Sequence, residues 1–133
     1  MLTARLEAPH RFLSAIRDGE PVERHGDGSA FRDWVFVEDA VDATLRVLDL
    51  GPRAQALYNV GSGKATTLAE FLAACEAVRG KAATVRAVGD RAGDVRGTVA
   101  DISRLRADTG FAPRVGLAEG LRRTAAYLDA AGA

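Results

Sequence analysis

The stretch YNVGSGKATTLAEF, residues 58–71, limits the possible folds more than any other part of this sequence. Residues 56–60 have strand composition, and the GSG at 61–63 directly after them predicts a tight turn. Thr67 and Glu70 then have the spacing of a capping box, in which each side chain accepts a hydrogen bond from a backbone N–H at a helix start. A strand, a turn and a capped helix in direct succession predict a mixed α/β chain.

The same stretch does not match a phosphate-binding loop of the Walker type. Tyr58 stands where the first glycine of that motif belongs, so the backbone freedom needed to wrap a phosphate is missing there. Ala65 follows Lys64, so no hydroxyl group is placed to hold a magnesium ion. The two glycines are therefore interpreted as a turn between strand and helix.

The rest of the chain continues this alternation. A single domain over residues 1–133 is expected, because a chain of this length buries a real core without disulfides or metals. Helices are expected at 9–18, 38–50, 67–79, 101–108 and from 117 onward, and strands at 22–25, 31–37, 56–60 and 84–88. The pattern indicates an α/β or α+β fold with about three or four short strands, and we predict the α/β class.

Two of these helices carry apolar residues at helical spacing. In the helix expected at 38–50, Val41, Leu45 and Leu48 recur on one side, which predicts an apolar face. Cys75 falls on the apolar side of the helix that follows the capping box. A small buried side chain is a better interpretation of Cys75 than a nucleophile.

The charge balance and composition exclude several classes of partner. Lysine plus arginine and aspartate plus glutamate both number 18, so no global field attracts nucleic acid or an anionic membrane. Trp34 and its aromatic neighbours could stack on bases, but no basic stripe accompanies them, and a buried strand is the better interpretation. With one cysteine, no signal-like start and no long apolar run, we expect a soluble, cytoplasmic protein with no nucleic-acid or membrane partner.

Catalytic and cofactor motifs are missing from the sequence. No stretch supplies the spaced glycines of a dinucleotide fingerprint. Neither Tyr58 nor Tyr127 is followed by a lysine four residues later, so the tyrosine–lysine pair of a hydride-transfer site is absent. His10 and His25 belong to no cluster of metal ligands. We therefore expect no catalytic, cofactor-binding or metal-binding residue in this chain.

Two arginines are candidates for a local anion site. Arg32 lies at the start of an expected strand, and Arg91 lies in a polar, glycine-containing loop together with Asp94. The planar guanidinium binds phosphate oxygens through two hydrogen bonds, and a nearby carboxylate accepts hydrogen bonds from sugar hydroxyls. The alternative is that these are surface arginines with incidental acidic neighbours.

Several motifs in a fixed order resemble a known family. The runs GDGSAFRDWVFVEDAVDA, YNVGSG and RAGDVRGTVADISRLRADTGFAPRVGLAEGLRRTAAYL are similar to the C-terminal part of NAD-dependent epimerases and dehydratases, which are extended short-chain dehydrogenases. The similarity runs from about Pro9 to the end of the chain and is greatest with UDP-glucose and UDP-glucuronate 4-epimerases. It leaves residues 1–8 unplaced.

The resemblance implies roles for four residues in binding a nucleotide sugar. Arg32 matches the arginine of the family's RD(F/W) motif, and Arg91 that of its R-x-G-D motif; both contact the diphosphate. Asp94 matches the aspartate that meets the ribose. His25 lies on the edge that reads the base, where the family usually has tyrosine or phenylalanine.

The resemblance also implies what this region lacks. In the family an N-terminal Rossmann domain holds NAD and the catalytic tyrosine, and YNVGSG forms a strand and turn of the shared sheet. The expected function is thus the nucleotide-sugar-binding lobe of such an enzyme, unable to transfer hydride alone and binding no NAD by itself. A non-catalytic nucleotide-sugar binder or an assembly module is the alternative. Expected partners are the nucleotide sugar and either a separate Rossmann half or further copies of the chain.

Overall fold

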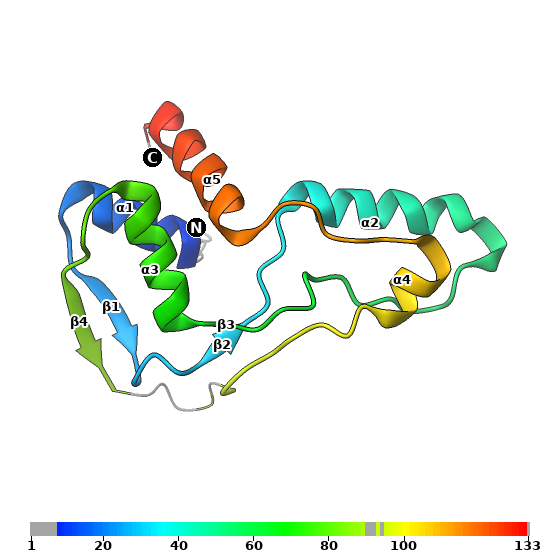
Figure 1. Ribbon diagram of the computed structural model, residues 1–133, viewed down its shortest axis with the longest axis horizontal. Coiled ribbons are helices and arrows are strands. Elements are labelled where there is room, and N and C mark those ends of the chain that lie inside the picture. Colours follow the sequence, from blue (N-terminus) through cyan, green and yellow to red (C-terminus); the bar gives the residue numbers. More distant parts are fainter. Residues whose placement is uncertain (1–7, 90–92, 94, 133) are drawn as a thin grey trace, which may run out of the picture.

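The computed structural model describes residues 8–89, 93 and 95–132, and in them the predicted α/β class is confirmed (Figure 1). Helices alternate with short strands along the chain. The elements are α1 (Ala8–Asp18), β1 (Val22–His25), β2 (Phe31–Arg32), α2 (Val37–Leu50), the 3₁₀ turn η1 (Gly51–Arg53), β3 (Thr66–Thr67), α3 (Leu68–Arg79), β4 (Val85–Val88), α4 (Ser103–Thr109) and α5 (Leu117–Ala131).

The strands form two small pairs. β1 and β4 run parallel, with Val22 opposite Val85 and His25 opposite Val88. β2 and β3 run antiparallel, and Phe31 also forms a parallel bridge to Gly97 on its other side. β2 is therefore held between β3 and the segment that contains Gly97.

The larger hydrophobic core lies among α1, α3, α5 and β1, which with β4 we call the helical lobe. Phe71 of α3 is fully buried, its ring centroid 5.6 Å from that of Phe12 and 4.3 Å from that of Trp34, on which it stacks. This supports the interpretation of Trp34 as a core residue. The buried members are Phe12, Leu13, Ile16, Val22, Phe71, Leu72, Cys75, Leu121, Ala125 and Leu128.

A second, smaller core lies between α2 and α4, in what we call the arm (residues 37–60 and 100–111). Figure 1 shows α2 and α4 extending together away from the helical lobe. Ala43 of α2 is buried against Ile102, Leu105 and Phe111, with Tyr58 packed on the same cluster. The molecule thus has two cores of unequal size.

The capping box was predicted correctly. Thr67 Oγ1 accepts a hydrogen bond from the Glu70 N–H at 3.1 Å, and Glu70 Oε2 accepts one from the Thr67 N–H at 2.8 Å. The backbone N–H of Thr67, assisted by its hydroxyl, holds the pKa of the Glu70 carboxyl below its ordinary value. Two unpaired N–H groups at the start of α3 are satisfied in this way.

Two of the expected strands were wrong: one is shorter than expected and the other does not form. The strand expected at 31–37 ends at Arg32, because Asp33 turns its carboxylate to another loop, Trp34 packs on Phe71, and α2 begins at Val37. Residues 56–60 form no strand, because no other strand in the described part of the chain pairs with them. Strand composition alone does not supply the partner that a ladder needs.

The apolar residues predicted on α2 do not face the core of this structure. Val41, Leu45 and Leu48 are exposed, whereas Ala43 and Val47 pack against α4. Helical periodicity identifies an apolar side of a helix but not what covers it.

Candidate functional site

Arg32 is held by the backbone contacts of β2. The Phe31 N–H donates to Arg96 O at 3.0 Å, and the Thr98 N–H donates to Phe31 O at 3.3 Å. On the chain just before β2, Ala30 O accepts the Leu68 N–H at 2.7 Å. These bonds fix the backbone from which the Arg32 side chain projects.

The Arg32 side chain is half-buried, and no described residue is its acidic partner. Its Nη1 donates to Phe31 O at 2.8 Å, and within residues 8–89, 93 and 95–132 it forms no ion pair. A partly desolvated guanidinium with donors left over is suited to an anionic ligand, because arginine carries its charge at every physiological pH.

His25 ends β1 and reaches the start of the next loop. Its Nδ1 lies 3.3 Å from Gly89 O, and the backbone N–H of Gly26 donates to Val88 O at 3.1 Å. Its Nε2 is buried and has no hydrogen-bond partner among the described residues. His25 therefore joins the ends of β1 and β4.

Arg91 and Asp94 lie outside the described residues, so their predicted roles stay predictions. The described residues on either side of them are informative. Gly89 is beside His25, and Arg96 is beside Phe31, the neighbour of Arg32. The described residues that flank Arg91 and Asp94 in the sequence therefore contact His25 on one side and Phe31, the neighbour of Arg32, on the other.

Asp33 is a central residue of this region that the sequence analysis missed. Its Oδ1 accepts hydrogen bonds from the Ser62 N–H at 2.7 Å and the Ser62 hydroxyl at 2.5 Å, and its Oδ2 accepts from the N–H groups of Gly63 at 2.9 Å and Ala100 at 3.2 Å. Partial burial alone would raise the pKa of Asp33, but these donors outweigh burial and hold the pKa below its ordinary value. Asp33 therefore ties β2 to two distant loops.

The glycine turn of the opening stretch now has a specific role. A Cβ at position 61 would lie 2.5 Å from Asp33 Oδ2 and 2.6 Å from the Ala100 Cβ, so only glycine allows this close approach. The amides that follow bind the carboxylate of Asp33 within the same chain. The signal in the sequence was a carboxylate in an apolar run, which needs donors when partly buried.

Asp39 fixes the start of α2 in a similar way. It is buried, and its two carboxylate oxygens accept the N–H groups of Arg114 at 3.0 Å and Val115 at 2.9 Å. Nearby, Arg123 of α5 pairs with Glu38 at 2.8 Å. The base of the arm is thereby fastened to the segment that leads into α5.

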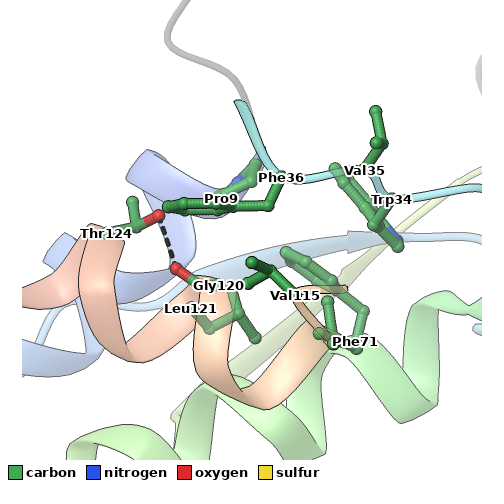
Figure 2. A pocket seen from close by; sticks show the side chains of 11 residues that line it. Pro9, Trp34, Val35, Phe36, Phe71, Val115, Gly120, Leu121 and Thr124 are labelled. Atoms are coloured by element: carbon green, nitrogen blue, oxygen red, sulfur yellow. Dashed lines mark hydrogen bonds between the residues drawn. The ribbon is translucent and has the colours of Figure 1, made fainter. Parts of the chain in front are cut away.

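A small apolar pocket lies between α1, α5 and the segment before α2, and Figure 2 shows it bounded by Trp34, Phe36 and Leu121. Its volume is about 80 Å³, well below the roughly 300 Å³ at which ligand pockets begin. The Thr124 hydroxyl beside it donates back to Gly120 O at 2.8 Å. We interpret this pocket as a packing gap, and Arg32 is not among the residues that line it.

Cys75 lies in the core of the helical lobe and not at the candidate site. Cys75 is fully buried, and burial raises the pKa of its thiol to about 12, so it is not a nucleophile at neutral pH. No group of three or more possible metal ligands occurs among the described residues. No helix in the described part of the chain is long and apolar enough to cross a membrane.

Comparison with known proteins decides the family. A family model described as GDP-mannose 4,6 dehydratase matches residues 8–124. The chain belongs to the NAD-dependent epimerase/dehydratase family. The family expected from the motifs is confirmed, and the match begins where α1 begins.

The similar proteins in this family include both dehydratases and epimerases. The dTDP-glucose 4,6-dehydratase of Streptomyces griseus is 36% identical over 88% of this chain, which covers 36% of that protein. The UDP-glucose 4-epimerase of Thermotoga maritima, solved with UDP-glucose, superposes with a TM-score of 0.89 at 28% identity, over 98% of this chain and 42% of its own. The Thermus thermophilus UDP-glucose 4-epimerase, solved with NAD, gives 0.82 at 33% identity, over 92% and 40%. The chain therefore spans well under half the length of these relatives.

Proposed function

We propose that this chain is the nucleotide-sugar-binding region of an NAD-dependent epimerase or dehydratase, with a UDP-sugar as ligand. The observation that carries the proposal is Arg32, a half-buried guanidinium without an acidic partner among the described residues. A relative of high structural similarity was solved with UDP-glucose. A cation on a fixed strand, with no acidic partner among the described residues, is suited to the charge of a diphosphate.

The other site residues complete the proposal. Arg32 and Arg91 would hold the diphosphate from two sides, Asp94 would accept hydrogen bonds from the ribose, and the edge at His25 would lie against the base. The flanks of the segment that carries Arg91 and Asp94 start beside His25 and end beside Phe31, which is consistent with one continuous surface. In this arrangement the chain binds and orients the nucleotide while the sugar extends beyond it.

The described residues do not fit the NAD cofactor of the family. The glycine turn at 61–63 does not offer the N–H groups of Ser62 and Gly63 to a phosphate, because they donate to Asp33. The sequence contains neither the dinucleotide fingerprint nor the tyrosine–lysine pair. We therefore assign binding and positioning of the sugar nucleotide to this chain and no hydride-transfer step.

A second candidate is a non-catalytic nucleotide-sugar binder or assembly module that keeps the fold. It shares Arg32 with the first proposal but requires no catalytic half. The two differ in whether sugar-nucleotide chemistry appears once an NAD-binding half is supplied.

Calorimetric titration with UDP and UDP-glucose tests the proposal. Arg32→Ala should weaken binding by about 2–3 kcal/mol, roughly a hundredfold, because a desolvated phosphate loses its charged partner. Arg53→Ala, which removes an exposed arginine from η1, is the matched control and should leave affinity unchanged. NAD should not bind. Equal UDP affinity in the wild type and in Arg32→Ala would contradict the assigned role.

A further inference from the structure

The register around β2 divides its neighbourhood into two faces. In the pair with β3, Phe31 lies opposite Thr67 and Arg32 lies opposite Thr66. On the other side of β2, Phe31 is bridged to Gly97. Residues that lie opposite each other share a face, and successive residues of an extended segment alternate between faces. One face therefore belongs to Phe31 and the other to Arg32.

The face of Phe31 is filled by the protein itself. A Cβ built at position 97 would overlap the Phe31 ring, so this ring lies directly over Gly97. Thr67, opposite Phe31, uses its hydroxyl to accept the Glu70 N–H at the start of α3. The contact between Phe31 and Gly97 thus fixes how the segment 95–99 lies against β2.

The opposite face carries charge and hydroxyl groups. Phe31 O accepts both the Thr98 N–H at 3.3 Å and Arg32 Nη1 at 2.8 Å, so the Arg32 guanidinium lies at the junction between β2 and the segment 95–99. Arg96 is the diagonal neighbour of Arg32 across this junction, a spacing of about 7–8 Å that long side chains span. We call this surface the two-arginine face, and its residues are Arg32, Thr66, Arg96 and Thr98.

No acidic side chain among the described residues forms an ion pair with either arginine. Asp27 is the nearest candidate. Hydrogen bonds from the Ser29 hydroxyl and N–H hold the pKa of Asp27 below its ordinary value, and the charge of Arg96 contributes a smaller part. Two like charges on neighbouring strands repel each other. An anion between Arg32 and Arg96 would relieve this repulsion.

We propose that Arg96 is a second diphosphate-binding cation, positioned beside Arg32 by the contact between Phe31 and Gly97. Each guanidinium holds one of two linked phosphate groups through paired hydrogen bonds, and the hydroxyls of Thr66 and Thr98 donate to the same oxygens. The inference rests on the proposed function and adds to it a binding residue that the family motifs do not assign. It also predicts a preference for two linked phosphates over one.

Calorimetric titration with inorganic pyrophosphate and inorganic phosphate at constant ionic strength tests the two-arginine face. Arg96→Ala should weaken pyrophosphate binding at least about tenfold, because a charge-assisted contact is lost. Phosphate binding should change much less, since a single phosphate group keeps Arg32. Arg53→Ala, on η1, is the matched control and should leave both affinities unchanged. Wild-type pyrophosphate affinity in Arg96→Ala, with an unchanged urea midpoint, would overturn the proposal.

A size exchange tests the positioning contact. Gly97→Ala should weaken pyrophosphate binding, because its methyl group displaces the segment that carries Arg96 from β2. Adding Phe31→Ala removes the obstructing ring and keeps the backbone hydrogen bonds, so the double variant should recover most of the lost affinity. Hydrogen exchange of the Thr98 amide should follow the same order. Unchanged affinity in Gly97→Ala, or a double variant as weak as Gly97→Ala, would refute positioning by this contact.

UDP titration of the same variants separates this inference from the proposed function. UDP binding that depends on Arg32 but not on Arg96 would overturn the inference and leave the proposed function standing. Pyrophosphate binding that needs both arginines, in a chain that binds no UDP, would refute the proposed function and leave the two-arginine face standing. Binding of neither ligand would overturn both.

Discussion

The helical lobe and the arm are built from helices with similar apolar periodicity, yet only the lobe closes its core. In the lobe α1, α3 and α5 all pack around Phe71 and Leu13. The nearly buried side chain of Arg79 joins them, with Nε donating to Leu13 O at 2.9 Å and Nη1 paired with Asp129 at 2.8 Å. In the arm α2 buries one side and exposes an adjoining apolar stripe, which we call the α2 stripe and which consists of Val37, Val41, Leu45 and Leu48. The difference is that the lobe buries the apolar sides of its helices, whereas α2 in the arm leaves part of its apolar surface exposed.

Two carboxylates connect these unequal parts. Asp33 ties β2 to the turn after residue 60 and to Ala100, and Asp39 ties the start of α2 to residues 114 and 115. Each carboxylate accepts hydrogen bonds from backbone N–H groups of an irregular segment, so these segments are held together although no sheet joins them. The arm is therefore held in a defined position although its apolar stripe is uncovered.

The largest expected effect is a cavity in the lobe. Phe71→Ala removes a ring that contacts Phe12 and Trp34, and should lower the free energy of unfolding by about 3–5 kcal/mol. Phe111→Ala, also fully buried but in the smaller arm core, should cost less because fewer neighbours surround it. Urea denaturation measures both. An equal or larger loss for Phe111→Ala would show that the arm is as complete as the lobe.

The next effect tests the connection between the two parts. Asp33→Asn replaces a carboxylate that accepts four hydrogen bonds and should cost about 2 kcal/mol at pH 7. Asp27→Asn is the control, since Asp27 is exposed and accepts the Ser29 N–H within its own turn, and it should cost much less than Asp33→Asn. Urea midpoints of the two variants decide whether Asp33 carries the connection.

The pH dependence of the same site has a definite sign. The folded pKa of Asp33 is lower than its unfolded value of 3.8, so its contribution is complete above that pH and is lost as pH falls below it. The stability of Asp33→Asn should therefore approach that of the wild type in acid. A difference between the two proteins that stays constant down to pH 2 would contradict this assignment.

The sequence predicts the lobe better than the arm for a physical reason. The capping box of Thr67 and the periodicity of α5 are local patterns, and both were predicted correctly. The interactions of Asp33 join residues 29 and more positions apart, so no local pattern reveals them. Residues 56–60 have the composition of a strand, but a strand forms only where a neighbour pairs with it. The incorrect expectations all concern segments whose structure depends on contacts with residues distant in the sequence.

The candidate site, too, could be predicted only in part from the sequence. Arg32 and His25 could be selected from motifs, and the structure places them at the two flanks of one segment. No local pattern predicts that Arg32 lacks an acidic partner among the described residues, because its sequence neighbours Asp33 and Glu38 bind other residues only in the folded chain. The roles of Arg91 and Asp94 stay predictions.

Cys75 provides a probe of whether the lobe stays closed. Burial raises the pKa of its thiol to about 12, above the unfolded value of 9.0, so the unfolded state loses the proton first as pH rises. The wild type should therefore lose about 1 kcal/mol of stability at pH 10 relative to its value at pH 8, in excess of any loss in Cys75→Ala. Urea unfolding at the two pH values measures this. Parallel pH profiles of both proteins would show that the thiol is accessible in the folded lobe.

The smallest expected effect gives the most specific test of how the arm differs from the helical lobe. Leu48→Ala removes an exposed leucine of the α2 stripe and should change the free energy of unfolding by less than about 0.5 kcal/mol, since surface substitutions leave no cavity. Leu105→Ala, which deletes the same atoms from the buried side of the arm, should cost about 2–4 kcal/mol.

The pair of leucine variants measures how one-sided the arm is. Both remove the same side-chain volume from the same part of the molecule, so helix propensity and residue size largely cancel, and the remaining difference reports burial. A large loss for Leu48→Ala would mean that the stripe is already covered in solution, and sedimentation of that variant would show whether a second copy covers it. A small loss for both would mean that the arm itself is loosely folded. Only a large loss for Leu105→Ala beside a negligible one for Leu48→Ala fits an arm that is folded on one side and open on the other.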